Sequence, residues 1–148
     1  MVNNFIYHWR SPKIDEIIGF KAPIDLSYAY DSEYLSCKRI IAVAGDIVKV
    51  TNTNIEVNGI KRTFDVPANI MRNLNTNYGA DYLENIGKTV YKYGVDKPYY
   101  VPEGHLFVIG DNYQFSLDSR NYGAIPCDII EGRVIKILWP LQDSGIVR

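Results

Sequence analysis

The chain has 148 residues, 47% of them hydrophobic, and a formal net charge of −1 at pH 7. This length suits one domain with a real core, the hydrophobic content argues against intrinsic disorder, and the near-neutral charge gives no sign of a polyanionic partner such as nucleic acid. Twelve tyrosines and five phenylalanines favour strands, and glycine and proline recur between short apolar runs. The composition therefore predicts a mostly β domain.

The first half of the chain reads as short strands separated by turn signals. The third of these segments carries Lys38 and ends before a Gly-Asp turn, and the fourth and fifth flank an Asn/Thr cluster, which indicates a hairpin. We predict strands at residues 2–10, 16–21, 35–43, 47–50 and 55–57, an exposed connection at 22–36, and a tight turn at Asn58-Gly59.

The second half is regular only at its end. Between residues 62 and 97 no clean period emerges, although part of 68–87 is expected to be helical. The pattern returns at 98–104, and the apolar run at 106–109 predicts a strand that delivers a polar loop. Residues 129–140 alternate again and predict a last strand.

Cysteine and histidine show no pattern typical of a metal site or a disulfide framework. Cys37 and Cys127 lie far apart in the sequence, and His8 and His105 are isolated. No pair has the spacing of zinc ligands. We therefore expect no metal and no cofactor, and we expect both histidines to be surface or half-buried residues, not catalytic bases.

The polar loop at residues 110–123 gathers side chains that can interact with one another. Asp118 and Arg120 are two residues apart and can form a bidentate pair, while the hydroxyls of Ser116 and Ser119 can hydrogen-bond a third polar group. Taken alone, this composition is more typical of a polar hairpin with a surface ion pair. Lys38, taken alone, is typical of a lysine that extends from a strand end into solvent.

Two segments together change this interpretation. Residues 38–46 read Lys-Arg-Ile-Ile-Ala-Val-Ala-Gly-Asp, and residues 110–123 read Gly-Asp-Asn-Tyr-Gln-Phe-Ser-Leu-Asp-Ser-Arg-Asn-Tyr-Gly. In this order they resemble the bacterial-type signal peptidase I family, membrane-bound serine proteases with a Ser-Lys dyad. The resemblance covers residues 2–60 and 98–140 and leaves about 62–97 as a variable insertion within a single catalytic domain, residues 1–148.

The resemblance implies an antiparallel β-sheet or barrel core and assigns roles to residues. Lys38 is the general base, which requires that burial lower its pKa from about 10.4 by as much as about 3–5 units. Ser116 orients Lys38 by hydrogen bonding. Support of the site falls to Asp118, Arg120, Ser119, Gly110, Asp111 and Asn112, and the expected substrate-lining residues are Ile17, Phe20 and Ile41.

The nucleophile is the point at which the chain departs from the family. In the family, the serine lies in a Ser-Met-x-Pro segment upstream of the lysine. The serines that precede Lys38 are Ser11, Ser27, Ser32 and Ser36, and none of them is followed by Met-x-Pro. We therefore expect the serine segment and the N-terminal membrane helix to be missing from these residues, and the chain alone to be inactive.

The implied function is removal of N-terminal signal peptides from translocated preproteins in protein secretion. The catalytic domain is expected on the extracytoplasmic or lumenal face of a bacterial plasma membrane, a thylakoid or a mitochondrial inner membrane. An alternative is a non-catalytic homologue that binds an extended peptide or a partner protein by strand addition. A self-cleaving Ser-Lys repressor fits less well, because its DNA-binding module is not found in the sequence.

Overall fold

The computed structural model describes residues 2–3, 5–21, 35–50, 54–62, 93–95, 97–111, 116–137 and 145–146. In these residues strands dominate and every strand pairing is antiparallel, as expected from the sequence. The elements are β1 (Val2–Asn3), η1 (Ile6–His8), β2 (Ile17–Lys21), β3 (Leu35–Val43), β4 (Ile47–Val50), β5 (Ile55–Val57), β6 (Ile60–Arg62), β7 (Tyr99–Tyr100), β8 (His105–Ile109), α3 (Ser119–Tyr122), β9 (Ile125–Pro126), η2 (Cys127–Ile129), β10 (Ile130–Val134), β11 (Lys136–Ile137) and β12 (Gly145–Ile146).

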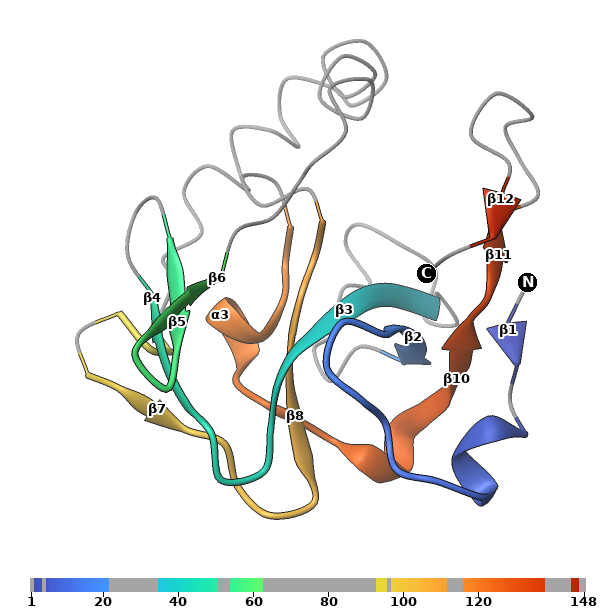
Figure 1. Cartoon of the computed structure of the whole chain (residues 1–148), viewed down its shortest axis with the longest axis horizontal. Helices are drawn as coiled ribbons and strands as arrows, with labels where there is room; N and C mark the ends of the chain where they lie inside the picture. The colour runs from blue at the N-terminus through green and yellow to red at the C-terminus, as the bar shows by residue number, and fades with distance from the viewer. Residues whose placement is uncertain are drawn as a thin grey trace, which may run out of the picture.

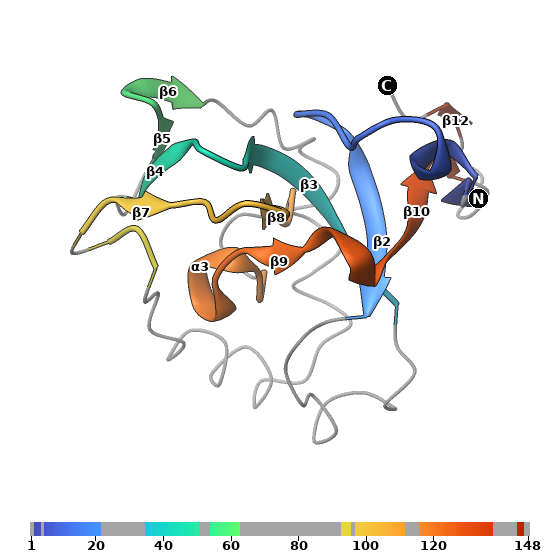
Figure 2. The same cartoon turned by 90° about the horizontal axis from the view of Figure 1, so that it is seen from below.

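Two sheets make up most of the described structure. One has six strands in the order β1-β10-β2-β3-β8-β9, and the other has four in the order β6-β5-β4-β7, while β11 and β12 form a separate pair. The four-stranded sheet lies at the left of Figure 1 and the six-stranded sheet to its right. A turn at residues 44–46 joins β3 to β4, so consecutive strands link the two sheets, and the short helix α3 lies beside β8 in both views (Figures 1 and 2).

The apolar side chains form two buried clusters that share β3 and β8. A register shift between Ile40 and Ala42 lets Ile41 and Ala42 both join the first cluster, while Ile40 joins the second. Burial of these side chains supplies the main driving force for the fold. The first cluster contains Ile41, Ala42, Val48, Val50, Ile55, Val57, Val101, Phe107 and Ile109, and the second contains Ile18, Phe20, Ile40, Leu106, Val108 and Ile125.

The predicted hairpins of the first half are confirmed. β4 and β5 pair across the Asn/Thr cluster, and β5 and β6 pair across Asn58-Gly59. Asn58 has φ 53° and Gly59 has φ 78°. Positive φ at both turn residues is the requirement of a type I′ hairpin turn, which Asn-Gly meets with little strain.

The predicted strand at residues 2–10 is wrong beyond its first two residues. β1 ends at Asn3, whose side-chain Oδ1 accepts a hydrogen bond of 3.0 Å from the Phe5 backbone N–H, and a short 3-10 helix follows. Such an Asn turn gives the backbone an alternative to strand pairing. The β-forming composition of this segment was therefore overridden by a local side-chain hydrogen bond.

Glu16 holds the segment after β1 against β2. Its buried carboxylate accepts hydrogen bonds from the Tyr7 hydroxyl and the Lys13 backbone N–H, and it pairs with the Arg10 guanidinium. Although burial acts in the opposite direction, these donors hold the pKa of Glu16 below its usual range. The chain must turn back at η1 for Tyr7 and Arg10 to reach this carboxylate.

The predicted last strand is divided in the structure. β10 pairs with β1 and β2, whereas β11 pairs with β12, so the partner changes around Ile135. Residues 138–140 lie outside the described residues, as does the expected helix within 68–87. In the part of the chain that the structure describes, no helix has the length and apolar character needed to cross a bilayer.

The backbone of Asp15 has a φ of 71°, which lies in the left-handed region. A Cβ in this region costs about 1–2 kcal/mol for most residues. We therefore expect Asp15→Gly to be more stable than Asp15→Ala by about 1 kcal/mol. Both variants lose the same exposed pair between Asp15 and Arg62, so urea unfolding of the two variants isolates the backbone contribution.

The exposed strand residue Lys61 provides the matched control. Here Ala should be the more stable replacement, because glycine weakens a strand interior. An Asp15→Ala variant as stable as Asp15→Gly would contradict the left-handed conformation of residue 15.

Candidate active site

Lys38 lies on β3 opposite Ile18 of β2, on the face of the sheet that carries the second apolar cluster. Residues that pair across antiparallel strands point to the same side, so the lysine stem packs beside Ile18. Burial lowers the pKa of Lys38, although the nearby Asp118 carboxylate acts in the opposite direction. Desolvation destabilises the ammonium form, so the neutral amine is more accessible than in an exposed lysine.

Ser116 lies next to this amine, above the backbone of Gly110. A Cβ at Gly110 would lie 2.1 Å from Ser116 Oγ and 3.6 Å from Lys38 Nζ. The amine and the hydroxyl are therefore less than about 6 Å apart, and only glycine leaves room for this approach.

The hydroxyl of Ser116 has no hydrogen-bond partner among the described residues, Lys38 included. The amine and the hydroxyl are thus close but not hydrogen-bonded in this state. Catalytic hydrogen bonds are often long before substrate binds and tighten only in the complex. The role of Ser116 in orienting Lys38 stays a prediction.

Asp118 and Arg120 form a fully buried bidentate pair. Arg120 Nε donates to Asp118 Oδ1 and Arg120 Nη2 to Asp118 Oδ2, both at 2.8 Å, and neither side chain has exposed surface. Asp118 Oδ2 also accepts a 3.0 Å hydrogen bond from the Gly110 backbone N–H. The pair therefore fixes the backbone on which Ser116 and Lys38 meet.

The same carboxylate begins α3. Asp118 Oδ1 accepts from the Arg120 backbone N–H, and the Asn121 side chain accepts in return from the Asp118 backbone N–H, which forms a capping box. Ser119 Oγ accepts a 2.9 Å hydrogen bond from the Val108 backbone N–H and so ties α3 to β8. One turn of helix is thus held at its start by side chains of the Asp-Ser-Arg motif.

Arg39 is a supporting residue that the sequence interpretation did not assign. Arg39 Nε and Nη2 donate to the two carboxylate oxygens of Asp111 at 2.8 and 2.7 Å, and Nη1 donates to the Asp15 backbone carbonyl. The signal was present, because Arg39 follows Lys38 in the first motif and Asp111 is the second residue of the second motif. The pair ties the lysine strand to the start of the polar loop.

The three expected substrate-lining residues differ in how deeply they are buried. Ile17 is half-buried, but Phe20 and Ile41 have no exposed surface and belong to the second and first apolar clusters, respectively. In this structure Phe20 and Ile41 pack the core and offer no surface to a substrate. Asn112, the remaining support residue, lies outside the described residues.

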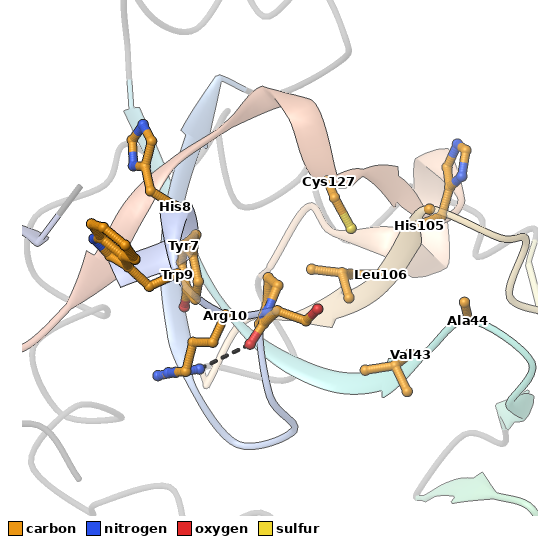
Figure 3. Close-up of a pocket in the computed structure, with 12 residues that line it drawn as sticks. Tyr7, His8, Trp9, Arg10, Val43, Ala44, His105, Leu106 and Cys127 are labelled. Atoms are coloured by element: carbon orange, nitrogen blue, oxygen red, sulfur yellow. Dashed lines mark hydrogen bonds between the residues drawn. The ribbon is translucent and has the colours of Figure 1, made fainter. Parts of the chain in front are cut away.

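A groove of about 540 Å³ lies away from Lys38 and contains none of the assigned site residues (Figure 3). Residues 7–12 line one side, and the end of β3, the start of β8 and the thiol of Cys127 line the other. Cys127 and Cys37 are both free, and burial raises the pKa of each thiol. A raised pKa disfavours the thiolate, which is the nucleophilic form of a cysteine.

The geometry defines a site for proton transfer. A lysine with a lowered pKa can accept a proton from a hydroxyl and return it to a leaving amine. The close approach at Gly110 brings the Lys38 amine near the Ser116 hydroxyl, and the buried Asp118–Arg120 pair holds the Gly110 backbone. A lysine so placed on a mostly antiparallel β fold is what a lysine-dependent hydrolase requires, and the base role of Lys38 stays a prediction.

Comparison with known proteins identifies the family. The family model described as signal peptidase, peptidase S26, matches residues 1–139. The chain is 33% identical over 144 residues to the thylakoidal processing peptidase 1, chloroplastic, of Arabidopsis thaliana, which covers 95% of this chain and 36% of that protein. It is 31% identical over 147 residues to the probable signal peptidase I-2 of Synechocystis sp., covering 99% of this chain and 57% of that protein.

A solved structure agrees with this result. The crystal structure of a signal peptidase I from Enterococcus faecalis matches with a TM-score of 0.54 and 28% sequence identity, covering 84% of this chain and 97% of that chain. The chain belongs to the signal peptidase family, peptidase S26. It spans only 36% and 57% of the lengths of the Arabidopsis and Synechocystis relatives.

Proposed function

We propose that this chain supplies the general base and its supporting loop to a signal peptidase I-type endopeptidase, which removes N-terminal signal peptides from translocated preproteins. The main observation behind this proposal is that Lys38 has a lowered pKa and lies near Ser116 and the buried Asp118–Arg120 pair. Family membership supports the reaction class.

The proposed reaction has two stages. In the first, neutral Lys38 takes the proton of a serine hydroxyl as its oxygen attacks the scissile carbonyl; the protonated amine then gives the proton to the leaving nitrogen, the peptide C–N bond breaks, and an ester forms. In the second, Lys38 takes a proton from water, which hydrolyses the ester and frees the serine. The attacking serine belongs to a Ser-Met-x-Pro segment that these 148 residues do not contain.

The edge of β3 supports binding of an extended substrate. Among the described residues, pairing between β3 and β8 begins at Arg39 and Ile109, so residues 35–37 pair with β2 alone. An unpaired strand edge beside the catalytic base can accept a polypeptide by strand addition. Such binding presents a peptide bond to Lys38 in extended form. Anchorage in a membrane, with this domain on the extracytoplasmic or lumenal side, places the site where translocated signal peptides emerge.

The same edge would also serve a non-catalytic homologue that binds an extended peptide. The lowered pKa of Lys38 favours the enzyme, because a peptide-binding module gains nothing from a desolvated lysine. Binding of a signal peptide without cleavage, by a form that carries the serine segment, would favour the homologue instead.

The test joins the chain to the anchor and serine segment of a signal peptidase relative and presents a preprotein with small residues at positions −3 and −1. We expect cleavage after −1, and we expect at least about a hundredfold slower cleavage when −1 is phenylalanine, because the family resemblance implies a preference for small residues at −3 and −1. Mass spectrometry of the products gives the site and the rate.

The matched control carries the same segment with its serine changed to alanine, and we expect no cleavage from it. Equal rates for small and large residues at −1 would contradict the proposed substrate class. Cleavage by the serine-to-alanine form at the full rate would contradict the dyad.

A further inference from the structure

We propose that Tyr99 is a positioning residue for this site, which acts through the C-terminal end of α3. The inference rests on the proposed role of Lys38 as the general base. Tyr99 belongs to β7 of the four-stranded sheet and lies 61 residues after Lys38 in the sequence. Its side chain connects that sheet to the segment just beyond α3.

The hydroxyl of Tyr99 holds the chain just beyond α3. It accepts a 3.2 Å hydrogen bond from the Ala124 backbone N–H. It also lies 3.4 Å from the position that a Cβ of Gly123 would occupy. Gly123 ends α3 with φ 86°, and its N–H bonds the Ser119 carbonyl at 2.9 Å. The phenol oxygen is thus an acceptor placed at the helix end.

The ring of Tyr99 is fixed from two sides, so the hydroxyl position is fixed as well. It packs at 5.5 Å from the Phe107 ring and edge-on at 5.4 Å from the Tyr93 ring, measured between centroids. Tyr99 also pairs with Val48 across the β4–β7 ladder. Aromatic pairs in these geometries add to the stability of the packing beyond their buried area.

Tyr93 makes a second connection to the same helix. Its backbone N–H donates to the Arg120 carbonyl at 3.1 Å, and its ring lies 3.5 Å from the Cβ position of Gly123. Tyr93 and Tyr99, which we call the tyrosine clamp, therefore hold α3 at its end, while the capping box holds it at its start. β7 and α3 are near each other in both views (Figures 1 and 2).

The tyrosine clamp acts on the environment of Lys38 through Asp118 and Arg120. Both residues belong to the turn that the clamp holds, and both contribute to the charge environment of the Lys38 amine. Displacement of α3 would admit water to this amine and weaken the desolvation on which its chemistry depends. By holding α3, the Tyr99 oxygen that accepts from the Ala124 N–H therefore helps to keep the pKa of Lys38, a residue of the other sheet, low.

Tyr99→Phe tests the inference, because it removes only the oxygen and keeps the ring. Tyr100→Phe is the matched control, since Tyr100 is the next residue of β7 and is 68% exposed. The measurement is an NMR titration of the lysine ε-carbons of the 148-residue chain, with Lys38→Met used to assign the Lys38 signal. It needs no cleavage activity.

We expect the Lys38 midpoint in the unaltered chain to lie below the ordinary value of about 10.4 and to rise by about half a unit or more in Tyr99→Phe. Tyr100→Phe should leave it unchanged. Amide hydrogen exchange should quicken at Ala124 and also at Gly110, whose N–H bonds Asp118.

A Tyr99→Phe chain with the Lys38 midpoint of the unaltered protein would overturn the inference and leave the proposed function intact. Faster exchange confined to Ala124, without a change at Lys38, would show a structural role only and would also overturn it. An ordinary midpoint in the unaltered chain would overturn the base role of Lys38 and this inference together.

Discussion

Replacing Lys38 with methionine is expected to abolish cleavage by the joined enzyme and to raise the melting temperature of the chain at pH 7. Methionine fills the space of the lysine stem but cannot accept a proton, and loss of a general base costs about 10²–10⁴ in rate. The stability gain follows from burial, which lowers the pKa of Lys38 and so disfavours the ammonium in the folded state. Methionine has no charge to desolvate.

The pH dependence of stability follows from the same lowered pKa. The unfolded chain binds the Lys38 proton more tightly than the folded chain, so unfolding takes up a proton and stability rises with pH. The rise lies between the lowered folded pKa of Lys38 and its unfolded value of about 10.4. The advantage of Lys38→Met should be greatest below this range and should shrink through it.

Thermal melts from pH 6 to 10 on both chains measure this difference, and Lys49→Met is the control, because Lys49 is an exposed residue of β4. The difference in melting temperature between the Lys49→Met control and the unaltered chain should lack the pH dependence that Lys38 gives. A Lys38→Met chain that melts lower at every pH would show that the ammonium is well solvated in the folded state, which contradicts the proposed base.

Replacing Arg120 with alanine is expected to destabilise the chain by about 3–5 kcal/mol, because it leaves the Asp118 carboxylate buried without its bidentate partner. For a chain of this size the melting temperature should fall by about 6–20 °C. Cleavage by the joined enzyme should fall as well, since Asp118 also holds the Gly110 backbone beside Ser116. Urea unfolding and the cleavage assay measure the two effects.

Arg62→Ala is the matched control for this variant. Arg62 pairs with Asp15 at 3.0 Å, close to the 2.8 Å of the buried pair, but the Asp15 side chain is 68% exposed. An exposed pair contributes about 0–1 kcal/mol, so the control should be nearly as stable as the unaltered chain. Equal losses from Arg120→Ala and Arg62→Ala would contradict a special structural role for the buried pair.

The sequence predicted the parts of the fold that depend on short-range patterns. The strand at residues 35–43 and the hairpin turn at Asn58-Gly59 are found as expected, because alternation and turn chemistry are local properties. The prediction of a strand at residues 2–10 was wrong because the Asn3 turn prevails over their β-forming composition. The hydrogen bonds of Tyr7 and Arg10 to Glu16 act in the same direction. These interactions join residues whose spacing is not that of a strand or a helix, so no periodic pattern predicts them.

For the site, the two motifs named the residues but not their contacts. The close approach of Ser116 to Gly110 depends on how β8 and the polar loop pack, and the burial of Phe20 and Ile41 depends on the bulge and strand order of the six-stranded sheet. The role of Tyr99 was not predicted, because its hydroxyl bonds the backbone N–H of Ala124. A hydrogen bond to the backbone requires no particular residue type, so the sequence does not reveal it.

The order of strands in the six-stranded sheet has a consequence for synthesis of the chain. β2 and β3 are made early, but their outer neighbours are β10 and β8, which are made last. At about 5–20 residues per second, the 61 residues that separate the end of β3 from the start of β8 take several seconds to translate. During that interval a growing chain that has paired β2 with β3 exposes two strand edges, which are templates for aggregation. We expect such growing chains to need chaperones until the last third of the protein has been made.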